Sequence, residues 1–398
     1  MPYRACRVIA YHTGTNFKYY KEEEFAGIDT LSEPFKDAAT ILDFTDVTKI
    51  TNRKLRMQVT RFAMVLHEAY KAIENHSSRT ARMPQVLKIF IAPEFLFRPL
   101  TANKYKEYAY TQAERDEFYT AINTLVSKGF MKHWVVIPGT FLWMWEKPDD
   151  TKAIVMNSSM IKIGGTTSYR TVTKKNASKE DGIEDAKHKP SNLTVEERET
   201  IYNRFPDRIA RIGGYNLGLE ICMDHDLLTM FLKTSALDHR KTVRGFEINF
   251  HTVSACGMST QVLSQVAKKG SYFIKLDGVV NQKKKFEVRQ ILNQGYNHDV
   301  DTLQTYTKAK ALWDKTQPST EERLRYREKL TKLNPSVYDP EILLGLDTVL
   351  KYVEGLPESS RFSEPLESEE IPISEAYQRK PKGKDVLRIS DSFKIYRL

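Results

Sequence analysis

Two strand-like runs that end abruptly in ionisable residues set the strongest constraint on the fold. The first is Lys88–Ala92, followed by a proline and Glu94, and the second is Gly218–Ile221, followed by Cys222. Short apolar runs of this kind are typical of strands in open α/β sheets that helices cover. Such sheets place their functional groups at the carboxyl ends of the strands, so we expect sites at Glu94 and Cys222.

Helical spacing between the strand-like runs supports this interpretation. Asn52 is expected to cap a helix whose apolar face runs to Ile73, and a second amphipathic helix over 111–126 leads into a strand over 134–137. This rhythm of strand, helix and strand predicts sheet layers covered by helices. Residues 14–50 contain Gly, Asp and Thr breaks and a Lys-Glu-Glu-Glu run, so we predict an irregular insertion there.

The two strand ends carry residue types suited to covalent catalysis. A thiol such as Cys222, emerging from a strand into a turn with free amide groups, is placed like a nucleophile. A free cysteine in an apolar strand is, however, commonly an inert small hydrophobe. Glu94 is followed by Phe-Leu-Phe, so we expect desolvation to raise its pKa toward that of a general base. A Cys-His-Asp protease is disfavoured, because His225 on the same turn would rarely reach the sulfur in the required geometry.

Together the Pro-Glu segment and the Gly-Leu-Glu-Ile-Cys-Met-Asp segment resemble the nitrilase, or carbon–nitrogen hydrolase, superfamily. Members share a glutamate, a lysine and a cysteine in that chain order. The resemblance extends to a strand with a Gly-Thr turn at 135–141 and to an Asn-led strand with a glycine hairpin at 157–165, and it covers about residues 3–280. It implies an α/β fold, a four-layer α-β-β-α sandwich, in which Glu94 and Cys222 are catalytic.

The family's lysine has more than one candidate. Lys174 ends the strand after the glycine hairpin, at about the family's distance from the asparagine of the preceding strand, and we favour it. Lys175 is its neighbour, and Lys187 lies near the usual interval before the cysteine. A second family glutamate corresponds to Glu196 or Glu197, although a capped and solvated helix start explains that segment equally well.

The chemistry that the resemblance implies uses all three residue types. Glu94 would take the thiol proton, and the thiolate of Cys222 would attack the carbon of a small linear amide or nitrile. Lys174 and the backbone N–H of Met223 would stabilise the oxyanion, and water would then cleave the thioester. Two alternatives stay open: an acyltransferase with the same triad, and a non-catalytic binding protein on this scaffold.

Length and composition limit the domain organisation. A chain of 398 residues with 40% hydrophobic residues can hold one core of about 250–300 residues plus an appendage. We predict a carbon–nitrogen hydrolase domain over 1–282 and a mainly helical C-terminal extension over 283–355, where apolar residues recur at helical intervals. Residues 356–398 are rich in Glu, Ser and Pro at their start and are predicted to be a flexible tail.

The net charge of +10, from 61 basic against 51 acidic residues, raises the question of a nucleic-acid partner. The excess is dispersed, and the local concentrations at Lys283–Lys285 and between Arg323 and Lys332 are typical of solvated helix faces. No basic motif interleaved with aromatic residues is present. We therefore expect no nucleic-acid partner, and by analogy with the family we expect a homodimer.

Cysteine usage and hydropathy indicate the compartment. The three cysteines lack paired spacing, which favours a reducing, cytoplasmic setting, while the C-terminal tail leaves export open. No apolar run reaches the roughly 18 residues of a membrane span. No Cys-x-x-Cys or His-x-x-x-His spacing occurs, so we expect neither a metal nor a cofactor. Phe141, Trp143 and Trp145 are expected in the core rather than along a pocket.

Overall fold

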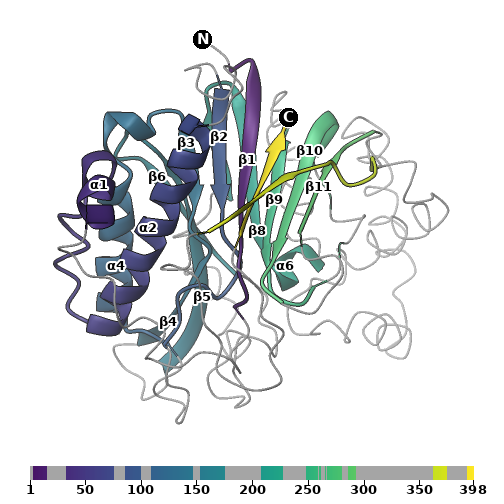
Figure 1. Ribbon diagram of the computed structural model, residues 1–398. Helices are drawn as coiled ribbons and strands as arrows, with labels where there is room; N and C mark the ends of the chain where they lie inside the picture. The colour runs from purple at the N-terminus through teal and green to yellow at the C-terminus, as the bar shows by residue number, and fades with distance from the viewer. Residues whose placement is uncertain are drawn as a thin grey trace, which may run out of the picture.

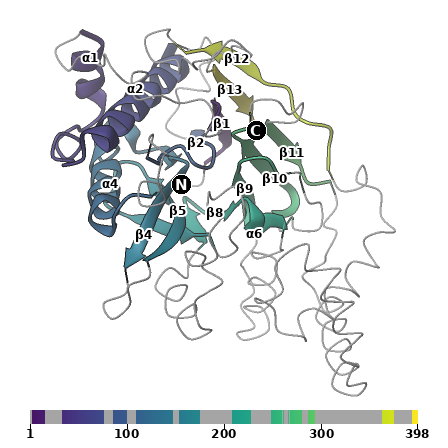
Figure 2. The same ribbon diagram turned by 90° about the horizontal axis from the view of Figure 1, so that it is seen from below.

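The computed structural model contains two β-sheets stacked face to face, with helices covering the outer face of the first sheet (Figure 1). Viewed from below, the layers follow one another as helices, first sheet and second sheet (Figure 2). The residues that the structure describes are 3–15, 33–75, 86–99, 109–146, 153–174, 208–226, 248–258, 260, 265, 267–279, 286–292, 362–373 and 392–398.

The first sheet has the strand order β12-β13-β1-β2-β3-β5-β4, and β6 pairs with β5. Its central strands β1, β2 and β3 are parallel, so their carboxyl ends lie at one edge. The strands of this sheet are β1 (Ala5–His12), β2 (Val86–Ile91), β3 (Trp134–Ile137), β4 (Thr140–Glu146), β5 (Ala153–Ile163), β6 (Tyr169–Thr173), β12 (Glu369–Pro372) and β13 (Ser392–Arg397).

The second sheet has the order β11-β10-β9-β8-β7 and a parallel centre made by β8, β9 and β10. In both sheets the carboxyl ends of parallel strands therefore lie at one edge, where the sequence predicted Glu94 and Cys222. The strands of the second sheet are β7 (Ile209–Ile212), β8 (Tyr215–Ile221), β9 (Ile248–Ala255), β10 (Ala267–Asp277) and β11 (Phe286–Gln290).

Strand β2 shows why the central strands are apolar on both faces. Leu87, Ile89 and Ile91 belong to the core between the two sheets, whereas Phe90 and Ala92 belong to the core between the first sheet and its helices. Side chains of a strand alternate between the two faces, and here both faces are buried. All six residues of β2 are buried as a result.

Within the described ranges, three helices cover the first sheet: α1 (Glu33–Ile41), α2 (Arg53–Asn75) and α4 (Gln112–Leu125). The Asn52 side chain accepts hydrogen bonds from the first backbone N–H groups of α2, at 2.9 and 3.2 Å. Thr111 forms a capping box with Glu114 at the start of α4. Both of these helices confirm their predictions. The prediction of an irregular insertion over 14–50 is wrong where α1 forms, because the alternation of apolar and charged residues there suits an amphipathic helix.

The expected α/β sandwich is confirmed in its helical layer and its two sheets. In the described residues, the expected fourth layer is represented by the short helix α6 (Met223–Asp226), which contacts β8. No helix in the described ranges is both long and apolar enough to cross a membrane.

The C-terminal expectations need correction. Strand β11 lies beyond residue 282 and extends the second sheet, so the helical extension over 283–355 is wrong for residues 286–290. The tail over 356–398 is not flexible throughout, because β12 and β13 form antiparallel pairs in the first sheet. Main-chain hydrogen bonds to β1 fix this segment despite its polar composition. The helices expected over 303–313, 321–333 and 340–353 lie outside the described residues.

Candidate active site

Glu94 follows β2 at the carboxyl end of the first sheet and is fully buried. The next residue, Phe95, has a φ of 61°, a left-handed conformation that non-glycine residues rarely adopt. The Thr140 hydroxyl holds this turn by accepting a hydrogen bond from the Phe95 N–H at 2.8 Å. Gly139 packs against it so closely that a Cβ there would lie 2.4 Å from the Pro93 carbonyl oxygen. The carboxylate is therefore held by a strained and tightly packed turn.

Two nitrogen donors contact the same oxygen of Glu94. Lys174 Nζ lies 2.9 Å from Glu94 Oε1, and the Asn157 side-chain amide donates to that oxygen at 2.9 Å. Lys174 is 2% exposed, so this is a buried ion pair. The Lys174 N–H also donates to the Asn157 carbonyl at 2.7 Å, which fixes the lysine at the end of β6. Removing either charge would leave the other buried and uncompensated, a cost of about 3–5 kcal/mol.

Cys222 ends β8 and begins the turn into α6. Its φ is 45°, and Phe95 and Cys222 are the two non-glycine residues with positive φ in the part of the chain that the structure describes. Cys222 donates its backbone N–H to the Ser254 carbonyl at 2.9 Å, and its own carbonyl accepts from the His225 N–H at 2.8 Å. A strained cysteine at a strand end is the geometry that presents a nucleophile at the head of a short helix.

Two bridges tie the Cys222 turn to the Glu94 and Lys174 segments. The Ser254 hydroxyl, beside Cys222, donates to the Ala92 carbonyl at 3.2 Å, two residues before Glu94. The buried Arg208 guanidinium donates to the Thr173 carbonyl at 2.8 Å and forms an ion pair with Asp224 at 2.8 Å.

These contacts join the residue before Lys174 to the residues after the cysteine. Segments far apart along the chain thus converge between the carboxyl ends of the two sheets.

The other cysteines, Cys6 and Cys256, are also buried and free. Burial raises the pKa of the Cys6 thiol. Burial, with a smaller contribution from the Glu94 charge, raises the pKa of Cys256 to about 12. Cys256 is therefore near Glu94 but stays protonated at neutral pH, which makes it a poor nucleophile.

Sequence reasoning identified part of this constellation. Among the candidate lysines, Lys174 contacts Glu94, while Lys175 and Lys187 lie outside the described residues, as do Glu196 and Glu197. The contact from Asn157 to Glu94 was missed, although the leading asparagine of that strand was the available signal.

The prediction that the three aromatic residues after Gly139 belong to the core is confirmed. Phe141 and Trp143 are buried in the core between the first sheet and its helices, and Trp145 packs against that core.

A second buried cluster lies beside the Cys222 turn. Glu220 Oε2 is 2.8 Å from His225 Nδ1 and 2.9 Å from His251 Nε2, and all three side chains are fully buried. His225 is thus engaged with Glu220, which is not the Cys-His arrangement of a protease. The ligand-type atoms of these three residues lie within 4.8 Å of one another, although no spacing motif in the sequence marked them as a group.

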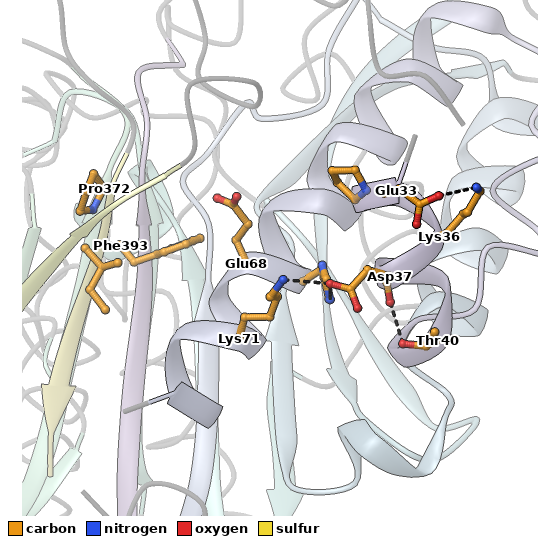
Figure 3. Close-up of a pocket in the computed structure, with 11 residues that line it drawn as sticks. Glu33, Lys36, Asp37, Thr40, Glu68, Lys71, Pro372 and Phe393 are labelled. Carbon is orange, nitrogen blue, oxygen red and sulfur yellow. Dashed lines mark hydrogen bonds and ion pairs between the residues drawn. The ribbon is translucent and has the colours of Figure 1, made fainter. Parts of the chain in front are cut away.

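A groove of about 960 Å³ lies elsewhere, between α1, α2 and the strands β12 and β13 (Figure 3). Charged side chains inside it pair with one another: Lys71 contacts Asp37 at 2.9 Å, and Lys36 contacts Glu33 at 2.6 Å. Phe393 lines the groove from β13. None of the three candidate catalytic residues lines this groove, which is therefore separate from the candidate active site.

Comparison with known proteins gives only distant similarities. No family model and no curated protein matches the chain. Similar solved structures include Saccharomyces cerevisiae Nit3, a member of branch 10 of the nitrilase superfamily, at 10% identity over 72% of this chain and 82% of that chain, with a TM-score of 0.36.

Two further structures have similar values. XC1258 from Xanthomonas campestris, a CN-hydrolase superfamily protein, is 9% identical over 72% of this chain and 83% of that chain, with a TM-score of 0.36. The NitN amidase from Neterenkonia sp. AN1 is 11% identical over 72% and 84%, with a TM-score of 0.33. Similarity at these values supports no conclusion about activity. Any proposal about activity therefore rests on the geometry of the site.

Proposed function

We propose that the chain is a nitrilase-type hydrolase that cleaves a non-peptide carbon–nitrogen bond of a small linear amide or nitrile. The observation that carries this proposal is the buried contact of 2.9 Å between Lys174 and Glu94 beside a strand end where Cys222 adopts a left-handed φ. A carboxylate, an ammonium group and a thiol, supplied by distant parts of the chain, are the groups that an acyl-enzyme mechanism needs.

In the first half-reaction Glu94 accepts the proton from the Cys222 thiol, and the thiolate attacks the amide carbon. The carbonyl oxygen gains negative charge, which the Lys174 ammonium and the Met223 backbone N–H stabilise; each such donor contributes roughly 3 kcal/mol. Collapse of the tetrahedral adduct breaks the carbon–nitrogen bond. Glu94 returns its proton to the departing nitrogen, which leaves as ammonia or an amine, and the acyl group stays on sulfur as a thioester.

In the second half-reaction Glu94 takes a proton from water, and the hydroxide formed attacks the thioester carbon. The carbon–sulfur bond breaks, the carboxylic acid leaves, and the proton on Glu94 returns to the sulfur of Cys222. Asn157 contributes by orienting the carboxylate through its hydrogen bond at 2.9 Å. Lys174 contacts the same carboxylate oxygen at 2.9 Å and orients it together with Asn157.

The test is intact-mass spectrometry of the protein incubated with a panel of short amides and nitriles. In Glu94→Gln we expect a mass increase equal to the acyl group with an amide, or to the whole nitrile held as a thioimidate, because loss of the base slows the hydrolysis of the adduct. Peptide mapping should locate the adduct on Cys222. In the Glu94→Gln background, Cys222→Ala should acquire no adduct, whereas the matched variant Cys256→Ala should acquire it as Glu94→Gln alone does.

Two outcomes would count against hydrolysis. An adduct that forms equally in Cys222→Ala would remove the proposed nucleophile. In the second outcome, added amines remove the acyl group from the adduct much faster than water does. That outcome would assign acyl transfer, because an amine would then be the natural acceptor of the acyl group.

A further inference from the structure

We propose that Glu220, His225 and His251 form a hydrogen-bonded clamp that holds the turn carrying Cys222 in its strained conformation, and that they act as positioning residues for this nucleophile. The inference rests on the proposed function, because it assigns a task to groups that the mechanism does not use. From the sequence, His225 was considered only as the histidine of a disfavoured protease arrangement, and neither Glu220 nor His251 was singled out as part of a site.

The clamp spans the cysteine. Glu220 precedes Cys222 by two residues on β8, and His225 follows it by three residues on α6. The contact of 2.8 Å between Glu220 Oε2 and His225 Nδ1 therefore closes a loop with the cysteine at its centre. His251 on β9 contacts the same oxygen at 2.9 Å and anchors the loop to the neighbouring strand.

The cluster acts from the side of the sheet away from the first sheet. Leu219 and Ile221 point into the core between the sheets, so Glu220, which lies between them, points to the opposite face. The rings of His225 and His251 pack on Phe273, each with centroids 5.3 Å from it. Since the cluster is fully buried on that face, it influences the reaction through the backbone of the turn.

The backbone needs such support. A φ of 45° at a residue with a side chain persists only where the surroundings hold it in place. Besides the clamp, the hydrogen bond from the His225 N–H to the Cys222 carbonyl fixes the same turn, so one residue contributes both through its main chain and through its ring. Loosening the ring contact would let the sulfur move away from the position that attack requires.

Hydrogen bonds explain the distances better than a metal ion does. Two ligand atoms about 2.0–2.1 Å from a tetrahedral ion lie roughly 3.3 Å apart, further than the 2.8 and 2.9 Å in the cluster. The distances are those of N–H groups donating to an ionised carboxylate. This interpretation requires the proton on Nδ1 in His225 and on Nε2 in His251.

The first experiment uses the unaltered protein labelled with ¹⁵N-histidine. Long-range ¹H–¹⁵N spectra, with peaks assigned by His225→Asn and His251→Gln, should show the Nδ1–H tautomer for His225 and the Nε2–H tautomer for His251. Metal analysis of the same sample should find no stoichiometric transition metal. The opposite tautomers, or one equivalent of zinc, nickel or manganese lost together with the histidine variants, would overturn the clamp.

The second experiment measures the alkylation rate of Cys222 by iodoacetamide, resolved from the other thiols by peptide mapping. We expect His225→Leu to lower this rate about a hundredfold, because it removes the donor. His225→Asn should largely restore the rate, since an amide N–H replaces Nδ1–H. The control is His67→Leu on α2, a buried histidine remote from the turn, which should leave the rate unchanged.

The outcomes separate this inference from the proposed function. If Cys222→Ala abolishes adduct formation from amides while folded His225→Leu reacts at the parental rate, the hydrolase stands and the clamp fails. The amide panel could also give no adduct, while the alkylation rate of Cys222 falls in His225→Leu and is restored in His225→Asn. In that case the clamp stands and the reaction class fails. Circular dichroism reports the fold of each variant, and where His225→Leu does not fold, the tautomers in the unaltered protein decide.

Discussion

Two thiols stand at the ends of adjacent parallel strands, and only one of them has the surroundings of a nucleophile. At the end of β8, Cys222 itself carries the positive φ of 45°, and the short helix α6 begins directly after it. At the end of β9, Cys256 is followed by Gly257, which carries the positive φ of 88°. The conformational strain thus falls on the proposed nucleophile in one turn and on a tolerant glycine in the other.

The backbone amides show a second difference. Asp277 accepts hydrogen bonds from the N–H groups of Gly257 and Met258, at 2.8 and 3.1 Å. The amide groups after Cys256 are therefore committed to a carboxylate and cannot stabilise an oxyanion. Burial near Glu94 in addition keeps the Cys256 thiol protonated. Proximity to the acid is thus not sufficient, because the turn that carries the sulfur has to be built for attack.

The largest expected effect comes from exchanging the two thiols for alanine. Cys222→Ala should lower turnover on the order of 10⁶-fold, because no other group forms the thioester. Cys256→Ala should leave most of the turnover. Initial rates with the best amide of the panel provide the measurement, and equal losses in the two variants would erase the distinction between the turns.

The next effect concerns Glu94, the proposed proton acceptor. Glu94→Gln should lower turnover roughly 10²–10⁴-fold, since it removes the proton acceptor. Glu117→Gln on α4, which alters a carboxylate bonded to Thr51, is the matched control and should have no effect on turnover. Circular dichroism should show a folded protein in both cases. A fully active Glu94→Gln enzyme would exclude the proposed base.

Alkylation as a function of pH sharpens the comparison directly. With a pKa of about 12, Cys256 is a thiolate in about one molecule in 10⁴ at pH 8, so its alkylation rate should rise tenfold per pH unit across the accessible range. Cys222, as the proposed nucleophile, should react faster than Cys256 at every pH. Peptide-resolved iodoacetamide labelling provides both curves, and faster labelling of Cys256 near neutral pH would contradict the assignment.

A smaller effect is expected from Asp277→Asn. The change replaces one acceptor oxygen with a donor, so one of the two N–H groups after Cys256 loses its partner, at a cost of about 1–3 kcal/mol in the free energy of unfolding. Urea unfolding measures this cost. Cys256 should stay unreactive because burial still disfavours its thiolate. An increase in Cys256 labelling in the folded variant would show that the committed amides alone had kept this thiol inert.

The smallest effect is a dependence of stability on pH at the β8 end. Burial lowers the pKa of His251 below 6.5, although Glu220 opposes this. Burial alone would raise the pKa of Glu220, but the hydrogen bonds from His225 and His251 outweigh it and lower the pKa from 4.5 to about 2. Both groups bind protons less readily in the folded chain, so their contribution to stability is present above their unfolded pKa values.

That contribution should be lost as the pH falls, first below about 6.5 for His251 and then between 4.5 and about 2 for Glu220. Urea midpoints of the parent and of His251→Gln, measured from neutral to acidic pH, test the first step. The variant should lose less stability between about pH 7 and 5. Parallel curves would show that His251 does not titrate differently on folding.

Sequence reasoning succeeded where local pattern and burial agree. The apolar strand before Glu94 and the helices after Asn52 and Thr111 follow from alternation, helical spacing and capping residues, which short segments encode by themselves. The pairing of Lys174 with Glu94 follows from the resemblance rather than from spacing. Neither the substrate nor the association of two copies has a signal in these patterns, and the homodimer stays a prediction.

Contacts between distant segments could not be predicted from the sequence. The Glu220 cluster draws on three elements, so no spacing motif marks it, and Arg208 reaches Asp224 and Thr173 from outside any motif. The polar, acidic composition before β13 suggested a flexible tail, yet main-chain hydrogen bonds to β1 need no particular side chains. Composition therefore cannot reveal a strand whose pairing is set by its partner.

The position of β13 has a consequence for how the protein acquires its structure. Arg7 on β1 pairs with Arg397 on β13. Strand β1, which lies beside the strand that leads to Glu94, therefore gains this neighbour only after the residues of β13 have been synthesised. During synthesis the edge of β1 stays open, and closure of such a distant contact is slow. Deletion of residues 392–397 should therefore disturb the sheet that supports the acid.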